Sequence, residues 1–464
     1  MPAPQPPLES RAAPHQHLSL LDSTSIIVGI IIGSSIYCST PLIAQQVPNV
    51  AWLAAVWVIG GVFTLIGALC YAEMASAYPE AGGDYVFLTE AFGRRLGLLF
   101  AWSQFWIIRP GSVAIFAFIY AYYANQILPL PESWRPLLVH AVGSVVVLSG
   151  INLLGVRAGK TTQNLLTLVK FLGLLAIVVV GLSVSSAAGA PSGAPAGAAG
   201  APSGSPRLDL GVAMIFIFFA YSGWNEMAYV SSEVRHPRKN ILRALLLGTL
   251  AVSAVYIAVN LAFVHALGMD GLRQSQAVAT DVLGLGIGPR AGRLISALIC
   301  ITVLGGINGM LFTGARIFYA VGTGHRLFAW LGHWNSQTDT PARPLIVQAV
   351  ATVAMLVGFG WRQQQTLQAF NDSVAFTSPT FWLFLYLVSH AYFVLRVRQS
   401  GLARTYRAPF YPVLPLLFCL ANAYMFFKSL DYAIEHTPWG LVASIAVLAI
   451  GAGLGFWVER GNNA

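Results

Sequence analysis

The sequence predicts an all-α integral membrane protein with about twelve transmembrane helices. Three observations carry this prediction: 56% of the 464 residues are hydrophobic, only 9% are charged, and the mean hydropathy is +0.68. An ordinary soluble domain carries about 25% charged residues, so this chain lacks the polar surface that water would require. A helix that crosses about 30 Å of hydrocarbon needs roughly 20 apolar residues, because its backbone hydrogen bonds must all be internal.

Apolar stretches of this length recur along almost the whole chain. They lie at 20–46, 50–77, 96–127, 136–154, 161–183, 208–232, 240–267, 292–322, 344–360, 367–396, 409–430 and 438–458. The connections between them are short and leave no room for a folded soluble domain. We therefore expect a single transmembrane domain over residues 20–458.

Two segments outside the spans have compositions typical of flexible chain. Residues 1–19 are polar, rich in proline and without the apolar core of a signal peptide, so we expect a disordered N-terminus and a retained first helix. Residues 187–206 are almost entirely Ala, Gly, Ser and Pro, which cannot bury enough apolar surface to offset the entropy of ordering. They predict a flexible external loop.

The distribution of basic residues predicts the orientation in a cell membrane. If the N-terminus is cytoplasmic, about 16 of the 26 Lys and Arg residues lie in cytoplasmic segments, against 7 in external segments and 3 within spans. Basic residues are enriched in cytoplasmic loops, so we expect a multi-pass protein with both termini in the cytoplasm. The net charge of +9 is then explained by basic residues in the loops of a protein whose partner is the lipid bilayer. Nucleic acid is not expected as a partner.

Small residues interrupt the first and sixth spans at corresponding positions. Residues 29–35 read Gly-Ile-Ile-Ile-Gly-Ser-Ser, and residues 219–225, about five spans later, read Phe-Ala-Tyr-Ser-Gly-Trp-Asn. Such paired breaks expose helix N-termini that attract a carboxylate and carbonyls that accept an ammonium group. They predict a site for a zwitterionic amino acid, although close helix packing is the alternative, since Gly and Ser are common in membrane helices.

With these motifs the sequence resembles the amino acid, polyamine and organocation superfamily, and within it the L-type amino acid transporters. The resemblance covers nearly the whole chain and rests on residues 29–37, 81–85, 107–110, 219–225 and 237–240. It implies two inverted five-helix repeats, at 20–184 and 208–396, followed by two further helices within 409–458. It also implies a secondary transporter that works by alternating access. We expect exchange or proton-linked transport, with both open, and expect independence from sodium because of Lys170. Neutral amino acids are the expected substrates, and cationic amino acids or polyamines are the alternative.

Matching positions imply roles for residues at both breaks. Ser34 and Ser35, with the intervening amides, would hold the substrate carboxylate, while the carbonyls of Ile31 and Phe219 would accept the ammonium group. The ring of Phe219 would pack over the ligand as a gate. The expected substrate-binding set is Ile31, Gly33, Ser34, Ser35, Phe219, Ser222, Gly223 and Asn225, with Phe219 and Trp224 as gate residues. Ser35 and Ser222 stand where the family usually has glycine, so we expect a narrower pocket.

The same resemblance bears on partners. Animal members of the family bond a glycoprotein heavy chain through a cysteine in the external loop after the third span. Residues 126–135, which form that loop here, contain no cysteine. No disulfide-linked heavy chain is therefore expected, and no cofactor or metal is expected either.

Ionisable and polar groups inside the spans are candidate functional residues, because an unpaired charge in the membrane costs several kcal/mol. Lys170, in the fifth span, resembles a fixed replacement for the sodium ion of related transporters. We expect its ammonium group to couple this span to the carbonyls of residues 29–32, with structural pairing as the alternative. Glu226 follows the second break and could face the substrate pathway and favour a cationic ligand. Asn308 either contributes to specificity or only joins helices by hydrogen bonds.

Three further charged residues are expected to be structural. Arg109 precedes Pro110, whose ring frees carbonyls one turn earlier that the guanidinium could bond, and substrate binding is the less favoured alternative for this residue. Glu73 and Glu233 lie near cytoplasmic helix ends and are expected to form ion pairs at the rim.

Other functional classes are less well supported by the sequence. An enzyme is not expected, because no Ser-His-Asp arrangement, metal pair or phosphate-binding loop can be assembled from the residues. A channel is disfavoured, because paired helix breaks favour an occluded site over an open pore. A sensor that binds amino acids without moving them stays open, and only a flux measurement separates it from a transporter.

Overall fold

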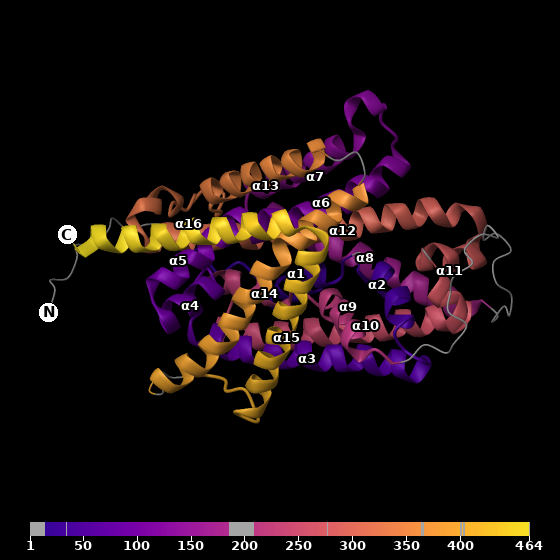
Figure 1. Cartoon of the computed structure of the whole chain (residues 1–464), viewed down its shortest axis with the longest axis horizontal. Helices are drawn as coiled ribbons and strands as arrows, with labels where there is room; N and C mark the ends of the chain where they lie inside the picture. Colours follow the sequence, from indigo (N-terminus) through magenta and orange to yellow (C-terminus); the bar gives the residue numbers. More distant parts are fainter. Residues whose placement is uncertain are drawn as a thin grey trace.

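The computed structural model describes residues 14–33, 35–184, 208–275, 277–362, 366–399, 401 and 404–463 of the chain. These residues fold into helices, most of which run roughly along the long axis of the molecule, with α14 and α15 inclined to it (Figure 1). Eleven helical segments among them are long and apolar enough to cross a membrane, and the bent pair α1 and α2 makes a twelfth. The expected all-α membrane fold with about twelve spans is confirmed.

The spans keep the order that the hydropathy pattern predicts. They are α1 (Leu20–Ile31) with α2 (Ser35–Ala44), α3 (Val50–Ala77), α5 (Arg94–Ser103) with η1 (Gln104–Ile108) and α6 (Arg109–Ile127), α7 (Pro136–Leu153), α8 (Val156–Ser183), α9 (Leu210–Ala220) with η3 (Trp224–Glu233), α10 (Pro237–Gln274), α12 (Ala291–Gly324), α13 (Ala342–Arg362), α14 (Thr366–Arg398), α15 (Val413–His436) and α16 (Pro438–Asn463).

Short helices fill connections that the sequence analysis treated as plain loops. They are α4 (Asp84–Phe92), η2 (Glu132–Trp134), α11 (Val278–Ile287), η4 (Gly288–Arg290) and η5 (Arg326–Leu331). Of these, α4 follows the second span, α11 follows the seventh, and the two lie at opposite ends of the bundle (Figure 1). An inverted relation between two halves of five spans would also place these two connections at opposite ends, and that relation stays a prediction.

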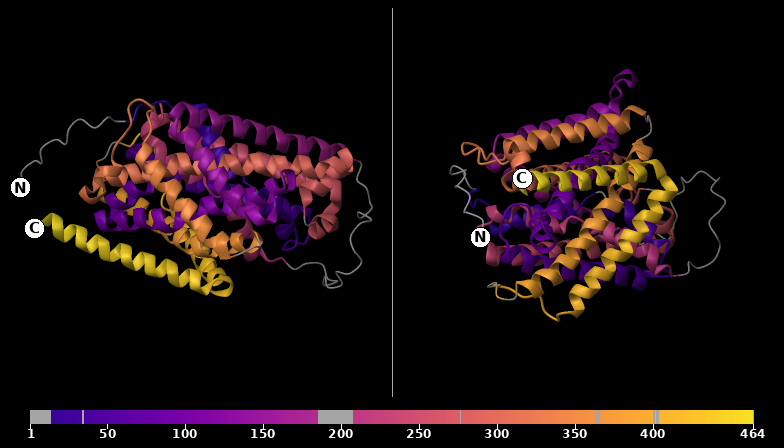
Figure 2. Two further views of the ribbon diagram at one scale, coloured as in Figure 1. Left: turned by 90° about the horizontal axis from the view of Figure 1, so that it is seen from above. Right: turned by 60° about the vertical axis from the view of Figure 1, so that its left-hand side comes forward.

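The segment of residues 14–19 and the end of α16 lie at one end of the bundle, which we call the terminal end. The segment before α1 enters the bundle there, and α16 finishes there after running along the outside of the other helices (Figures 1 and 2). At the start of α1, Ser19 caps the helix: its hydroxyl accepts a hydrogen bond from the amide of Asp22, while Asp22 accepts one from the amide of Ser19. This reciprocal cap satisfies two amides that would otherwise be unpaired at the helix start.

Both predicted helix breaks are present. The first separates α1 from α2 at a bend of 45°, and Ser34, in that break, lies outside the described residues. The second follows Ala220, where Gly223 takes a φ of +99° and the chain continues as the 3₁₀ helix η3. A Cβ on Gly223 would lie 2.7 Å from the side chain of Ile30, so glycine is required there both for the backbone turn and for close approach of the two breaks.

Candidate functional site

A cavity of about 110 Å³ lies between the two breaks. Besides α1, α2, α9 and η3, its wall includes η1, α6, α12 and α14. The residues that line it on the broken spans are Ile30, Ile31, Gly33, Ser35, Phe219, Ser222, Gly223, Asn225, Glu226 and Tyr229. Every predicted substrate-binding residue that the structure describes is among them. This volume is several times what one water molecule needs.

A tyrosine that the sequence analysis missed joins the two breaks. The hydroxyl of Tyr256, on α10, lies 3.0 Å from the carbonyl oxygen of Ile31 and 3.1 Å from that of Ala220. These are the carbonyls that the helix ends leave free, and each oxygen has a second lone pair available. The arrangement holds the two carbonyl-bearing ends together at the cavity. In the sequence, the only signal for this residue is that it is an aromatic residue within the seventh span.

Ser222 uses its hydroxyl locally. It donates a hydrogen bond to the carbonyl oxygen of Phe219 at 2.9 Å, one of the two carbonyls expected to accept the ammonium group. The same carbonyl also accepts the backbone amide of Ser222 at 3.3 Å, so both of its lone pairs already have protein donors in this structure. On the opposite wall, a Cβ on Gly33 would lie 3.2 Å from the ring of Phe116, so this part of the cavity is narrow.

The two aromatic residues expected as gates have different surroundings. Phe219 lines the cavity and is 38% exposed, so its ring does not seal the space in this structure. Trp224 points elsewhere: its ring packs edge-on against Tyr71 and Phe418, with centroid separations of 4.8 and 5.9 Å. It lies outside the lining of this cavity, so in this structure Trp224 has packing contacts only, and its role as a gate stays a prediction.

Arg109 and Glu226 form a buried ion pair in the cavity wall, with 2.8 Å between guanidinium nitrogen and carboxylate oxygen. Glu226 also accepts a hydrogen bond from the hydroxyl of Thr313, and the guanidinium lies over the ring of Tyr229 at 5.3 Å. The expected bonding of Arg109 to carbonyls freed by Pro110 is therefore wrong. The chain instead accommodates the proline with the π-helical turn η1, and the guanidinium reaches across to the second break.

Lys170 makes the contacts that were expected of it, and one more. Its side chain is fully buried, and its ammonium group donates to the carbonyl oxygens of Gly29 and Ile32 at 2.7 and 2.9 Å. It also donates to the carbonyl of Thr302 on α12, at 3.0 Å, which the sequence analysis did not foresee. A lysine on α8 thus joins the first break to the eighth span.

Asn308 lies away from the cavity. Its Oδ1 accepts a hydrogen bond from the side-chain amide of Asn152 at 2.7 Å, and its Nδ2 donates to Gln163 Oε1 at 2.9 Å and to the carbonyl of Gly159 at 3.2 Å. These partners belong to α7 and α8. Of the two roles considered for Asn308, the structure supports the joining of helices.

The acidic residues expected at the rim are instead fully buried. Glu233 and Arg316 face each other in a two-bond arrangement at 2.7 and 2.9 Å, each with a side chain 1% exposed. Glu73, also 1% exposed, pairs with Arg404 and accepts a hydrogen bond from the amide of Ala408 at 2.7 Å. The ion pairs were expected, but their position at the rim is wrong: the segment before α1 packs against Glu233, and the connection between α14 and α15 brings Arg404 and Ala408 onto Glu73.

Asp84 is a further acidic residue close to the cavity. It begins α4, outside the spans, and accepts a hydrogen bond from the hydroxyl of Tyr229 at 2.6 Å. Burial raises the pKa of Asp84 to about 6, while the bond from Tyr229 acts in the opposite direction. Since Tyr229 lines the cavity, this carboxyl group is separated from the cavity by one tyrosine.

Comparison with known proteins adds independent information. The sequence pattern described as amino acid permease matches residues 18–450. Human b(0,+)-type amino acid transporter 1 is 28% identical over 418 residues, which cover 88% of this chain and 82% of the relative. Mouse large neutral amino acids transporter small subunit 2 is 30% identical over 416 residues, covering 87% and 75%. Mouse Asc-type amino acid transporter 1 is 32% identical over 352 residues, covering 75% and 66%.

Proposed function

The chain belongs to the amino acid permease family, and from that premise we propose that it moves neutral amino acids by alternating access, without sodium. Amino acid transport by a multi-pass membrane protein follows from the family and its relatives. The substrate class, the coupling and the orientation are the parts that we propose.

The neutral preference rests on the pair of Arg109 and Glu226. An unpaired carboxylate in the cavity wall would attract a second ammonium group and so favour arginine, lysine or a polyamine. Here the guanidinium lies 2.8 Å from that carboxylate, and these two are the only charged residues among the described ones that line the cavity. The name of one relative, which refers to large neutral amino acids, points the same way.

The zwitterionic part of the substrate would bind at the breaks. The start of α2 at Ser35 presents amides to a carboxylate, and the end of α1 presents the carbonyl of Ile31 to an ammonium group. Both residues line the cavity. The substrate's side chain would then extend toward Phe219 and the aromatic residues of α14.

Independence from sodium rests on Lys170. Its ammonium group occupies the position between α1, α8 and α12 where a bound cation would otherwise join them. The three hydrogen bonds of this group supply the coupling contact without a bound ion. Exchange and proton-linked uptake both agree with this arrangement.

The orientation and partners complete the proposal. With both termini in the cytoplasm of a cell, the buried pairs of Glu233 and Glu73 would close the cytoplasmic side, while Phe219 stays 38% exposed in the cavity wall. The structure then corresponds to a form closed toward the cytoplasm.

The external loop at 126–135 has no cysteine for a disulfide-linked heavy chain.

Reconstituted protein tests the substrate class directly. We expect unlabelled leucine or alanine to compete better than arginine for uptake into proteoliposomes. If arginine competes better than leucine, and Glu226→Gln reverses that order, the neutral preference is wrong. Stabilisation by an amino acid in a thermal-shift assay without any flux would indicate a sensor instead.

The cavity itself is tested by Phe219→Ala. Because the ring lines the cavity and is 38% exposed, its loss should reduce uptake at least tenfold while hardly changing stability. Phe427→Ala is the matched control, since this phenylalanine on α15 is 63% exposed and lies outside the cavity lining. Normal uptake by Phe219→Ala at equal surface expression would exclude the proposed site.

A further inference from the structure

The segment before α1 is fixed across the terminal end of the bundle. The amide of Leu18 donates to the carbonyl of Glu233 at 2.8 Å, and the amide of Arg235 donates to the carbonyl of Leu18 at 2.9 Å. These two bonds form a parallel β-bridge between Leu18 and Val234, next to the end of η3. Residues 15–17 are thereby held beside the loop that joins η5 to α13.

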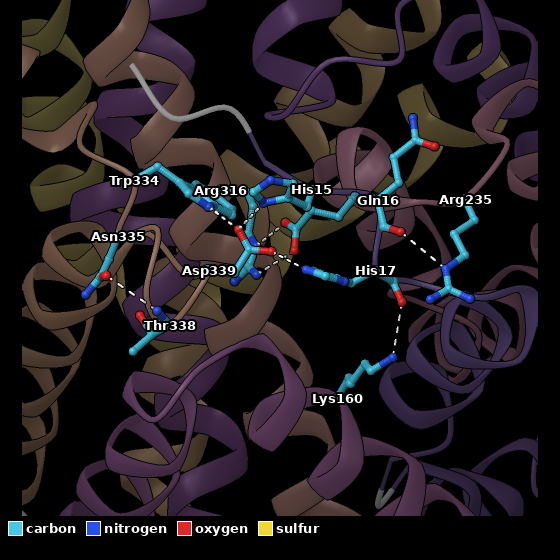
Figure 3. A network of polar contacts seen from close by, with 11 residues as sticks. His15, Gln16, His17, Lys160, Arg235, Arg316, Trp334, Asn335, Thr338 and Asp339 are labelled. Atoms are coloured by element: carbon cyan, nitrogen blue, oxygen red, sulfur yellow. Dashed lines mark hydrogen bonds and ion pairs between the residues drawn. The ribbon is translucent and has the colours of Figure 1, made fainter. Parts of the chain in front are cut away.

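Two histidines of this segment meet one carboxylate of that loop. Nδ1 of His15 lies 3.2 Å from Asp339 Oδ1, and Nε2 of His17 lies 2.6 Å from Asp339 Oδ2. Figure 3 shows both rings directed at the same carboxylate from the segment that also carries Gln16. Residues 15 and 17 are separated by 324 and 322 positions from Asp339, so only the folded chain brings the three together.

The carboxylate is held in place by its own loop. Asp339 takes a φ of +53° in a turn that is closed by backbone hydrogen bonds between Asn335 and Thr340, at 3.0 and 3.3 Å. The indole nitrogen of Trp334 donates to Asp339 Oδ1 at 2.6 Å, and its ring packs against Tyr319. The other oxygen, Oδ2, is buried and accepts no hydrogen bond of good geometry among the described residues.

We propose that His15, His17 and Asp339 bind a divalent transition-metal ion, with Zn²⁺ as the probe. The ligand atoms that they offer lie within 4.8 Å of one another. Zinc bonds of roughly 2.0–2.2 Å at tetrahedral angles place ligand atoms about 3.3–3.6 Å apart. The contact from His15 to Asp339, at 3.2 Å, is close to this range, and His15, with 68% of its side chain exposed, can turn toward the ion.

The ligand types select the class of ion. Two imidazoles and one carboxylate suit Zn²⁺ and similar divalent transition-metal ions, whereas Mg²⁺ and Ca²⁺ prefer a full set of oxygen ligands. Three protein ligands leave a fourth position for water. The indole of Trp334 is the kind of outer hydrogen-bond donor that orients a ligating carboxylate.

The positively charged side chains near the cluster repel a metal ion only weakly, because each is paired with a carboxylate or exposed to water. Lys160, whose ammonium group donates to the carbonyl of His17, is paired with Asp22 at 3.0 Å. Arg316, which lies beside the cluster in Figure 3, is neutralised by Glu233. Arg235 is exposed, so water and salt screen its charge.

The position of the site gives the ion a consequence for transport, which rests on the proposed function. A bound ion would join the segment that leads directly into α1 to the loop before α13. Opening of the terminal end requires α1 or η3 to move away from that loop. The ion would therefore hold the terminal end closed and slow transport.

Metal binding is measured first and needs no transport. Full-length protein is purified, treated with a chelator and titrated with Zn²⁺ by calorimetry, with Co²⁺ absorption as a second probe of tetrahedral coordination. We expect one site per chain, at least tenfold weaker in His15→Ala or His17→Ala and absent when both are replaced. His333→Ala is the matched control, since this exposed histidine on the same loop lies outside the cluster.

An unchanged Zn²⁺ affinity in the double variant would overturn the site. Neither histidine is buried, so both variants should keep the melting temperature of the metal-free protein, and a loss of binding would not reflect unfolding. In proteoliposomes, Zn²⁺ on the terminal side should slow uptake by the parent and His333→Ala proteins but not by the double variant. Zn²⁺ that binds at the cluster and leaves uptake unchanged would overturn the closing effect. A parent protein without uptake would count against the proposed function alone.

Discussion

Replacing Lys170 with alanine is expected to reduce uptake on the order of 100-fold, in sodium and in choline buffers alike. The ammonium group donates three hydrogen bonds, two of them to the carbonyls of Gly29 and Ile32 in the first span. Hydrogen bonds to a charged group contribute about 1.5–3 kcal/mol each, so the two bonds from Lys170 stabilise the contact between α8 and the first span by about 3 kcal/mol at the low end. Since 1.4 kcal/mol is a factor of ten, this corresponds to about 100-fold in an equilibrium between conformations.

Two further variants separate coupling from stability. Gly305→Ala keeps the charge, but its Cβ would lie 2.8 Å from the ammonium nitrogen of Lys170 and must displace it, so we expect a smaller loss of uptake. Leu172→Ala, on a half-exposed position of the same helix, should transport normally. Each protein is checked for monodispersity and for thermal stabilisation by substrate. A monodisperse, ligand-binding Lys170→Ala protein with normal uptake would refute the coupling role, and parent uptake that collapses in choline would refute sodium independence.

Three other variants test the cavity, the buried ion pair and the buried acid. Gly33→Leu should cut uptake at least tenfold without loss of folded protein, because its Cβ would lie 3.2 Å from the ring of Phe116 and the longer side chain would fill the cavity. Arg316→Met should lower stability by about 3–5 kcal/mol, seen as a fall in melting temperature, and adding Glu233→Met should restore most of it, since the unpaired buried charge is then gone. Burial raises the pKa of Asp84 from 3.8 to about 6, so between these values the folded chain holds a proton that the unfolded chain has lost, and stability falls as the pH rises. The melting temperature of Asp84→Asn, relative to that of the parent protein, should therefore increase as the pH rises from about 4 to about 7. A difference that does not change with pH would contradict the raised pKa of Asp84.

The positions of the spans and of both breaks could be predicted because their causes are local. An apolar run of about 20 residues can lie only in hydrocarbon, and a glycine that must adopt a positive φ, such as Gly223, leaves its mark at the position where the helix ends. The contact of Lys170 with the first break was also predictable. A buried ammonium group needs acceptors, and the carbonyls of a broken helix are the ones that the membrane leaves available.

The partners of the other charges could not be predicted, because in the sequence each has several candidates. Arg109 could have bonded carbonyls of its own helix, and Glu226 could have faced water. Their contact depends on how the third and sixth spans pack, 117 residues apart. The depth of Glu233 was missed for the same reason, because hydropathy places a residue near a helix end but does not say what covers it.

The sequence by itself determined that this chain spans a membrane, where its helices break and that it is an amino acid transporter, because apolar length, small residues at the breaks and family motifs are properties of short segments. Only the tertiary structure decided that Glu226 is neutralised, that Trp224 packs away from the cavity, and that two histidines before the first helix meet Asp339. These depend on distances between side chains far apart in the chain, which are settled when the helices pack together.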